Sequence, residues 1–246
     1  MSELRPNEVE LARKLQEAQS ITVFTGAGIS TASGIPDFRS RGGLYDLELP
    51  VERIVAESFF YQKPKLFWTH FKSIFHFQNI GNYKPNDGHI FLRELEQAGK
   101  QVTIVTQNVD GLHRRAGSGH VLEVHGTLQT AHCPKCRRTY EFEHLIKEEI
   151  PRCEQDDFIL KPDVVLFEGS VKHLEEAFAA AAHADLFLAL GTSLNVYPVK
   201  ELPRYAKGGL GKAIINREPT DMDGLFDAVI HDDIVDVFSR IRRFVL

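Results

Sequence analysis

Four short segments of the chain carry polar residues that could bind a ligand and act on it chemically. Each segment follows a run of β-branched or apolar residues typical of a buried strand. Open α/β sheets bind their ligands just beyond the carboxyl ends of parallel strands, so the segments predict a single crevice. They are Gly26-Ala27-Gly28-Ile29-Ser30, Thr106-Gln107-Asn108-Val109-Asp110-Gly111-Leu112-His113, Leu122-Glu123-Val124-His125-Gly126 and Gly191-Thr192-Ser193-Leu194.

The glycines of the first segment favour a bound pyrophosphate, because glycine has no Cβ to keep phosphates away from the backbone. The ordinary dinucleotide fingerprint is not met, since its third glycine would stand where this chain has Thr31. A tight structural turn is the alternative interpretation of these glycines.

The elements that must position these segments indicate an α/β fold with a mainly parallel, Rossmann-like sheet. Continuous apolar runs predict strands buried on both faces, and helical patterns supply cover for both faces. The predicted strands are residues 21–25, 102–106, 121–124, 163–167, 186–190, 213–216 and 228–230, and the predicted helices are residues 7–19 with Asn7 as cap, 88–98, 171–183, 198–206 and 234–244.

Two stretches do not follow this alternation and predict insertions. Residues 41–84 are rich in aromatic side chains and indicate a helical insertion, whereas residues 128–160 contain all three cysteines. We expect both to form a small domain beside a larger, Rossmann-like domain, which would contain the predicted crevice. The larger domain would comprise residues 1–40, 85–127 and 161–246.

Composition excludes several classes of protein. The chain has 246 residues, with 29 Lys and Arg against 34 Asp and Glu, so a net charge of −5 leaves no basic excess to attract nucleic acid. The first residues contain no apolar signal core, and the most apolar stretch, residues 177–190, is shorter than the ~20 residues of a membrane helix. Three cysteines, two of them in Cys133-Pro134-Lys135-Cys136, suit a metal site in a reducing compartment. We therefore expect a cytoplasmic protein without nucleic acid or membrane partners.

In their order and spacing, the motifs resemble the sirtuin family of NAD-dependent protein-lysine deacylases, and the chain looks like a small, core-only, bacterial-like member. The resemblance implies NAD as co-substrate and proteins with acetylated lysine as partners. It also implies nicotinamide, free lysine and O-acetyl-ADP-ribose as products. The matching segments are GAGIS, SGIPDFR, TQNVDGLH, VHG, CPKC, KPDVVLF, GTSLNVYP and Ile215-Asn216.

The resemblance further implies roles for single residues. His125 would be the general base that activates a ribose hydroxyl, a task suited to a neutral imidazole, and Asn108 would join it in catalysis. Asp110 would accept a hydrogen bond from the nicotinamide carboxamide. The residues implied to bind NAD are Ala27, Thr31, Phe38, Arg39, Gln107, Asn108, Val109, Asp110, His125, Thr192, Ser193, Asn216 and Asp233.

Val165, Phe167 and Val196 are candidates for an apolar tunnel around the acyl-lysine and for the edges that pair with a substrate strand. Burying about four methylenes contributes roughly 3 kcal/mol, whereas burying an unpaired ammonium costs more, so unmodified lysine is excluded. The Tyr-x-x-Arg pair of sirtuins that prefer acidic acyl groups is missing from residues 68–74, which favours acetyl and other neutral groups. For Val165, an ordinary core strand is the alternative.

The chain departs from the family at two places. Phe167-Glu168-Gly169 inverts the family's Phe-Gly-Glu, which bears on how the substrate backbone is held. The family's zinc site has two Cys-x-x-Cys pairs, but here Asp156 stands in the position of the fourth thiolate, after Cys133, Cys136 and Cys153. A carboxylate can bind zinc, so a structural Cys₃Asp site is implied, with no metal as the alternative.

Two other functions would use the same pocket. One is ADP-ribosyl transfer or NAD hydrolysis without deacylation, and the other is NAD sensing without catalysis. Intact Asn108, Asp110 and His125 disfavour the sensor.

Overall fold

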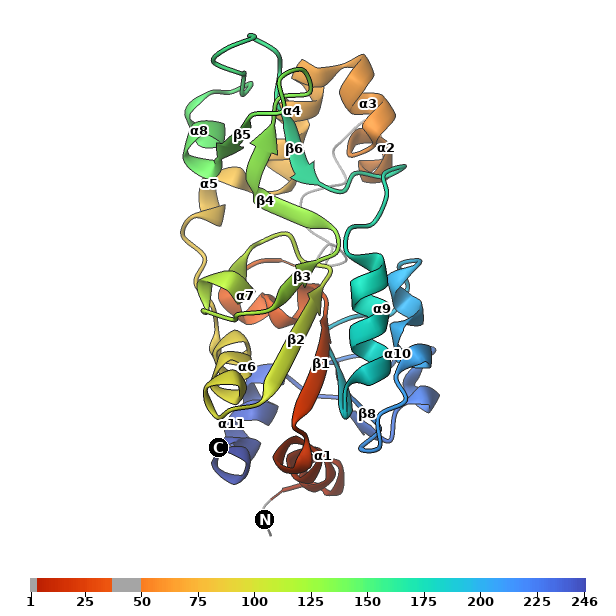
Figure 1. Ribbon diagram of the computed structural model, residues 1–246. Helices are drawn as coiled ribbons and strands as arrows, with labels where there is room; N and C mark the ends of the chain where they lie inside the picture. Colours follow the sequence, from red (N-terminus) through yellow and green to blue (C-terminus); the bar gives the residue numbers. More distant parts are fainter. Residues whose placement is uncertain (1–3, 37–49) are drawn as a thin grey trace.

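The computed structural model describes residues 4–36 and 50–246, which form two lobes (Figure 1). The lower lobe in Figure 1 contains a sheet of six strands in the order β3-β2-β1-β7-β8-β9, with every neighbouring pair parallel. The predicted α/β class and Rossmann-like parallel sheet are confirmed. The strands are β1 (Ser20–Thr25), β2 (Gln101–Thr106), β3 (Val121–Glu123), β7 (Leu186–Leu190), β8 (Lys212–Ile215) and β9 (Ala228–Ile230).

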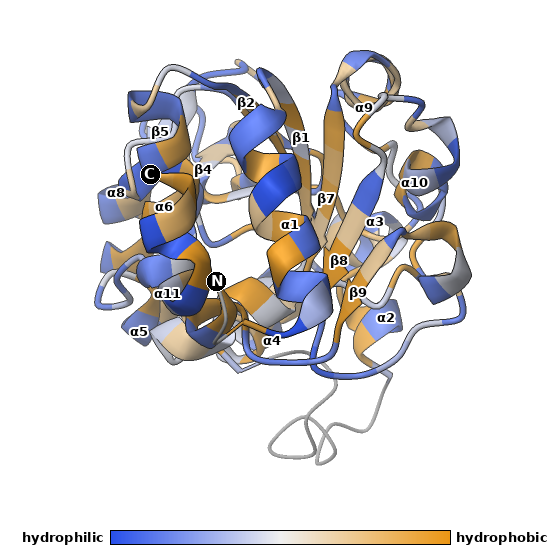
Figure 2. Ribbon diagram, turned by 90° about the horizontal axis from the view of Figure 1, so that it is seen from below, coloured by the Kyte–Doolittle hydropathy of each residue, from blue (hydrophilic) through white to orange (hydrophobic). Residues whose placement is uncertain are grey.

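Helices cover both faces of this sheet because its strands are apolar on both sides, as the orange colour along much of β1 and β7 shows in Figure 2. Within β1, Ile21 and Val23 pack in one buried cluster with the first set of helices, whereas Phe24 packs in a second cluster with the other set. The first set is α1 (Pro6–Glu17), α6 (Asp87–Gln97) and α11 (Ile234–Val245), and the second is α9 (Leu174–His183) and α10 (Leu202–Tyr205).

The second lobe combines the two predicted insertions. Its core includes aromatic side chains of the helical segment, and the fully buried Trp68 donates a hydrogen bond from its indole N–H to the carbonyl of Leu160 at 2.8 Å. This bond ties the helices to the cysteine-bearing segment. The lobe contains α2 (Val51–Ile54), α3 (Glu57–Gln62), α4 (Pro64–Ile74), α5 (Phe77–Ile80), β4 (Gly126–His132), β5 (Thr139–Glu141), α8 (Phe142–Lys147) and β6 (Lys161–Val164).

The prediction of a strand of the parallel sheet over residues 163–167 is wrong. The strand is β6, which pairs antiparallel with β4 in the three-stranded sheet β5-β4-β6. Only Pro162 and Val164 of β6 are buried, so one face of this strand packs on a core, unlike the fully covered strands of the large sheet. The division of the chain into two domains stays a prediction, and its boundaries at residues 127 and 161 fall in β4 and at the start of β6.

Helix α1 also begins differently from the prediction. Pro6 occupies its first turn and Arg5 is the residue before it, so Asn7 lies inside the helix and is not its cap. The Asn7 amide instead donates to the carbonyl of Val229 at 2.7 Å. No helix among the described residues is long and apolar enough to cross a membrane.

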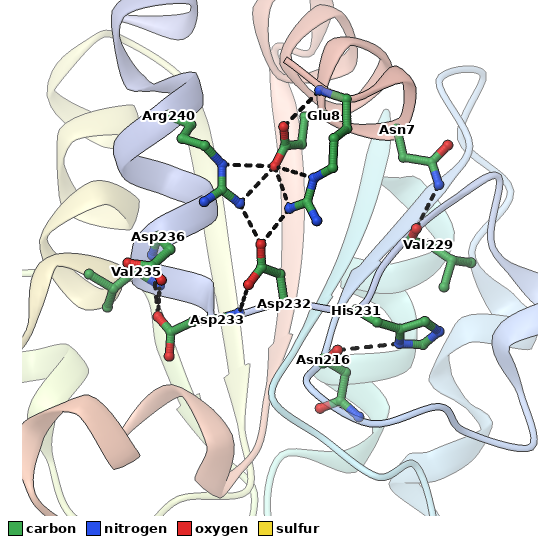
Figure 3. Close-up of polar contacts among 11 residues, drawn as sticks. Asn7, Glu8, Asn216, Val229, His231, Asp232, Asp233, Val235, Asp236 and Arg240 are labelled. Carbon is green, nitrogen blue, oxygen red and sulfur yellow. Dashed lines mark hydrogen bonds and ion pairs between the residues drawn. The ribbon is translucent and has the colours of Figure 1, made fainter. Parts of the chain in front are cut away.

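A buried carboxylate joins α1 to α11. Glu8 is 1% exposed and accepts hydrogen bonds from Arg5 at 2.6 Å and from Arg240 at 2.7 Å, while Asp232 also contacts both arginines (Figure 3). Burial alone would raise the pKa of Glu8, but the hydrogen bonds from Arg5 and Arg240 outweigh it and lower the pKa. The charged form of Glu8 therefore stabilises the fold.

Glu8→Gln is expected to lower the free energy of unfolding at pH 7 by about 2 kcal/mol. This loss is smaller than for breaking a fully buried ion pair, because both arginines are partly exposed. The folded-state pKa lies below the ordinary value of 4.5, so this stabilisation is present above that pH and is lost as the pH falls through the lowered pKa. Urea denaturation measures the difference. The control Glu17→Gln removes an exposed ion pair with Arg13 and should cost less than about 0.5 kcal/mol. Equal losses in both variants would contradict the role of burial.

Candidate active site

A cleft of about 1520 Å³ opens where the carboxyl ends of the parallel strands meet the second lobe. The strand order reverses between β1 and β7, which is the place where open α/β sheets form their ligand crevice. The four polar segments predicted from the sequence all contribute to its lining. The four segments therefore meet in one cleft as expected, and their roles in binding and catalysis stay predictions.

The glycines of the first and fourth segments bring two loops into contact. A Cβ on Gly28 would lie 2.6 Å from Cα of Gly191, and a Cβ on Gly26 would lie 2.8 Å from the Gly191 carbonyl oxygen. Gly191 itself has φ of +58°. Both loops thus need glycine for their own packing, which supports the structural-turn interpretation alongside any role in ligand binding.

Asn108 and Asp110 are joined by a serine that the sequence reasoning missed. The Asn108 amide donates to the Gly26 carbonyl at 3.1 Å and to Ser30 Oγ at 3.2 Å, and the Ser30 hydroxyl donates to Asp110 at 2.8 Å. The backbone N–H of Leu112 donates to the other oxygen of Asp110 at 2.8 Å. Burial raises the pKa of Asp110 against these hydrogen bonds. Ser30 belongs to the quoted GAGIS segment, but its partners are distant in sequence.

His125 is oriented by the backbone of the residue that follows β2. Its Nδ1 lies 3.2 Å from the carbonyl oxygen of Gln107, which can only accept, so the proton of the neutral ring is on Nδ1 and Nε2 stays available as a base. Burial lowers the pKa of His125, although the bond to Gln107 opposes this, and the ring is neutral at pH 7. The Gln107 side chain donates to Thr192 Oγ1 at 2.8 Å, which links the ends of β2 and β7.

The far end of the cleft lies at the start of α11. Asp233 accepts from the backbone N–H groups of Val235 and Asp236 at 2.8 and 3.2 Å, and so caps this helix (Figure 3). Its second oxygen accepts from Arg217 at 2.6 Å. Arg217 follows Asn216 directly and is the only Lys or Arg in the described part of the cleft lining, a residue that the sequence reasoning missed.

Three residues at the rim were predicted to meet the substrate. Phe167 is 53% and Val196 46% exposed, and both line the cleft. Val165 also lines it, and its backbone N–H donates to the carbonyl of His125 at 2.8 Å. Val165 lies beyond the end of β6, so it is not part of a core strand.

All the described residues that were predicted to bind NAD are brought to this one cleft, and Phe38 and Arg39 lie outside the described residues. The lining includes Ala27, Thr31, Gln107, Asn108, Val109, Asp110, His125, Thr192, Ser193, Asn216 and Asp233.

The four predicted metal ligands gather in the second lobe, where their ligand atoms lie within 4.8 Å of one another. The Cys136 and Cys153 sulfurs are 3.6 Å apart, and an Asp156 oxygen is 3.8 Å from the Cys133 and the Cys153 sulfur. Sulfurs bound to one tetrahedral zinc lie about 3.8 Å apart, so the arrangement fits this ion.

Comparison with known proteins shows similarity along most of the chain. The sequence model of the Sir2 family matches residues 26–198. A protein of Geobacillus kaustophilus named NAD-dependent protein deacetylase 2 is 51% identical over 237 residues, which cover 95% of this chain and 96% of that protein.

Solved structures agree with this similarity. One, described as "Structural Basis for the Mechanism and Regulation of Sir2 Enzymes", has a TM-score of 0.86 and 37% identity, and the match covers 98% of each chain. Another, described as "Sir2-p53 peptide-NAD+", has a TM-score of 0.82 and 33% identity over 95% of this chain and 96% of the other.

Gly28→Ala is expected to displace the first loop from Gly191 and to weaken the binding of NAD. The measurement is the rise in melting temperature on adding NAD, which should be smaller than in the wild type. Gly224→Ala is the control, because a Cβ there would meet nothing within 4 Å. An unchanged NAD-dependent rise in Gly28→Ala would show that the contact with Gly191 does not shape the site.

Proposed function

The chain belongs to the Sir2 family, and we infer that it is an NAD-dependent protein-lysine deacetylase that yields nicotinamide and O-acetyl-ADP-ribose. The observation that carries this inference is the contact of His125 Nδ1 with the Gln107 carbonyl, in the cleft that also contains Asn108 and Asp110. A positioned imidazole with a lowered pKa is equipped to accept a proton near neutral pH.

In the proposed reaction the acyl oxygen of the substrate lysine displaces nicotinamide from the ribose of NAD. Nε2 of His125 then accepts the proton of the ribose hydroxyl that attacks the acyl carbon. A water molecule adds to the same carbon, and the bond from this carbon to the lysine nitrogen breaks, so that free lysine leaves and the acetyl group stays on the ribose. Asp110 would receive the nicotinamide carboxamide, and Asn108, whose amide nitrogen is engaged by Gly26 and Ser30, would present its oxygen to the reacting end of NAD. Thr192, Ser193, Asn216 and Asp233 would hold the adenosine half, Asp233 acting through its bond to Arg217.

The preference for neutral acyl groups is supported by the charges around the cleft. Lys72 is the basic residue of the stretch that lacks Tyr-x-x-Arg, and it donates instead to the carbonyls of Leu145 and Glu148. Burial lowers the pKa of Lys72, and its contacts keep it inside the second lobe. Arg217, the one Lys or Arg of the described cleft lining, is engaged by Asp233, so among the described residues an acidic acyl group would be buried without a free basic partner, at a high cost in free energy.

Zinc is proposed as a structural ion held by Cys133, Cys136, Cys153 and Asp156. The donor set fits, since three sulfurs and a carboxylate converge without other ligands nearby in the described chain. The Lys135 ammonium lies 3.3 Å from Asp156 Oδ1, and the Tyr140 hydroxyl donates to the Cys153 sulfur at 3.2 Å. These neighbouring side chains orient two of the four proposed ligands. When bound, the ion would stabilise the fold of this segment and take no part in the reaction.

We propose that the substrates are proteins with acetylated lysine and that the enzyme is located in the cytoplasm. The reduced state that a three-thiol site needs is maintained in that compartment. The net charge of −5 gives no support to a nucleic acid partner.

Nicotinamide release with and without an acetyl-lysine peptide tests the function. Release that depends on the peptide supports deacetylation, release without it supports NAD hydrolysis or ADP-ribosyl transfer, and no release supports an NAD sensor.

His125→Ala is expected to reduce peptide-dependent release by about 100-fold or more, while NAD still binds. The control His183→Ala changes an exposed histidine at the end of α9 and should leave the rate unchanged. Activity of His125→Ala near the wild-type rate would exclude it as the base.

Asp156→Cys is expected to slow the loss of zinc to a chelator and to raise the melting temperature, because a thiolate binds zinc more tightly than a carboxylate. Elemental analysis should find up to one zinc per chain in the wild type. Cys133→Ser should lower metal content and stability together. Wild-type protein that contains no zinc and melts at the same temperature as Cys133→Ser would refute the site.

A further inference from the structure

The turn that follows Phe167 has a backbone conformation that favours glycine but contains a glutamate. The N–H of Gly169 donates to the carbonyl of Leu166 at 3.0 Å, which closes a four-residue turn, and Glu168 in its third position has φ of +75°. This is the geometry of a type II turn, in which the third residue is usually glycine because a side chain is strained there. The inverted order Phe-Glu-Gly noted in the sequence therefore has a conformational cost.

Position 169 needs glycine for a separate reason. A Cβ on Gly169 would lie 2.9 Å from the Leu166 carbonyl oxygen and 3.1 Å from Oε1 of Glu57. Glu57 is itself held by Lys161, whose ammonium lies 2.9 Å away, so it has little freedom to move aside. The chain thus cannot adopt the order Gly-Glu here without shifting the turn.

The Glu168 side chain forms a contact that offsets its strained backbone. Its two carboxylate oxygens accept from the backbone N–H and from the hydroxyl of Ser58, each at 3.0 Å. Ser58 lies in the first turn of α3, where backbone N–H groups have no partner within the helix. We call this pair of hydrogen bonds the turn latch.

The backbone on both sides of the latch is also attached to the helical segment. The N–H of Phe167 donates to the carbonyl of Val55 at 3.0 Å, and its carbonyl accepts from the N–H of Glu57 at 3.1 Å. Both backbone polar groups of Phe167 are therefore engaged, while 53% of the residue remains exposed. Phe167, Glu168 and Gly169 all line the cleft.

We propose that the turn latch between Glu168 and Ser58 fixes the rim of the cleft in the conformation that receives the acetyl-lysine peptide. Glu168 is a positioning residue, acting through Phe167 and not on the reacting atoms. A rim that is ordered in advance spares the peptide the entropy cost of ordering it, so the latch contributes to peptide affinity. This inference rests on the proposed function, because it assigns the rim to the peptide.

Glu168→Ala removes the latch and retains the strained conformation. We expect the Kd of a fluorescently labelled acetyl-lysine peptide, measured by polarisation, and the KM for that peptide to rise about tenfold, as for the loss of hydrogen bonds to a charged group. The kcat at saturating peptide and the KM for NAD should stay unchanged. A Kd equal to that of the wild type, or an equal rise in the KM for NAD, would overturn the proposal.

Two further variants separate the latch from backbone strain. Glu168→Gly relieves the backbone strain but lacks the carboxylate, so we expect it to bind the peptide more weakly than the wild type. Wild-type affinity of Glu168→Gly would show that backbone strain alone matters. Glu168→Gln can still accept from the Ser58 N–H and donate to its hydroxyl, and should bind peptide within about twofold of the wild type. Loss of affinity in Glu168→Gln as large as in Glu168→Ala would contradict the latch.

Glu143→Ala, at an exposed glutamate of α8, is the matched control and should bind peptide like the wild type. Because polarisation measures binding without turnover, the latch is tested even if the wild type releases no nicotinamide, which would contradict only the proposed function. Wild-type protein without affinity for the peptide would overturn both.

Discussion

The close approach of the loops after β1 and β7 is the constraint on which the site depends. With Gly28 and Gly191 in contact, the two central strands end at the same level, and the loops from β2, β3 and β8 line one cleft beside them. The hydrogen bonds of Asn108 to Gly26 and of Gln107 to Thr192 then hold the neighbouring loops against this centre. His125 is oriented by the carbonyl of Gln107, and the Gln107 side chain donates to Thr192 beside Gly191, so the proposed base is connected to this centre through Gln107.

The two lobes contribute different parts of the site. The parallel sheet supplies the polar groups that would handle NAD, whereas the rim around Phe167 is attached by backbone hydrogen bonds to the helical segment of the other lobe. The indole of Trp68 joins that segment to the cysteine-bearing one. A structural ion at the cysteines would thus act on the substrate end of the cleft only through several packed contacts, far from the chemistry itself.

Local sequence patterns predicted the six strands of the parallel sheet and the meeting of four polar segments in one cleft, because continuous apolar runs and glycine loops have local causes, whereas the individual NAD-binding residues were implied by the family resemblance. What they missed depends on contacts between distant residues. Nothing near residue 163 indicates that β6 leaves the parallel sheet to pair with β4, since pairing is decided by the partner strand. Ser30 could be noticed in its motif, but its bond to Asp110 spans 80 positions. Asp233 was predicted to bind NAD, and that role stays a prediction, but only the folded arrangement reveals that its carboxylate also caps α11 and binds Arg217.

The network around Glu8 has a consequence for how the protein is made. Arg240 reaches Glu8 across 232 positions of sequence, and Asp232 in the same network precedes the residue that caps α11 (Figure 3). During synthesis, α1 leaves the ribosome long before either partner exists, with a carboxylate and an apolar face that only α11 and β9 complete. The end of the cleft proposed to hold adenosine therefore forms among the last parts of the lobe, and a nascent chain that stops short of residue 232 has the proposed base, His125, but no closed cleft beside it.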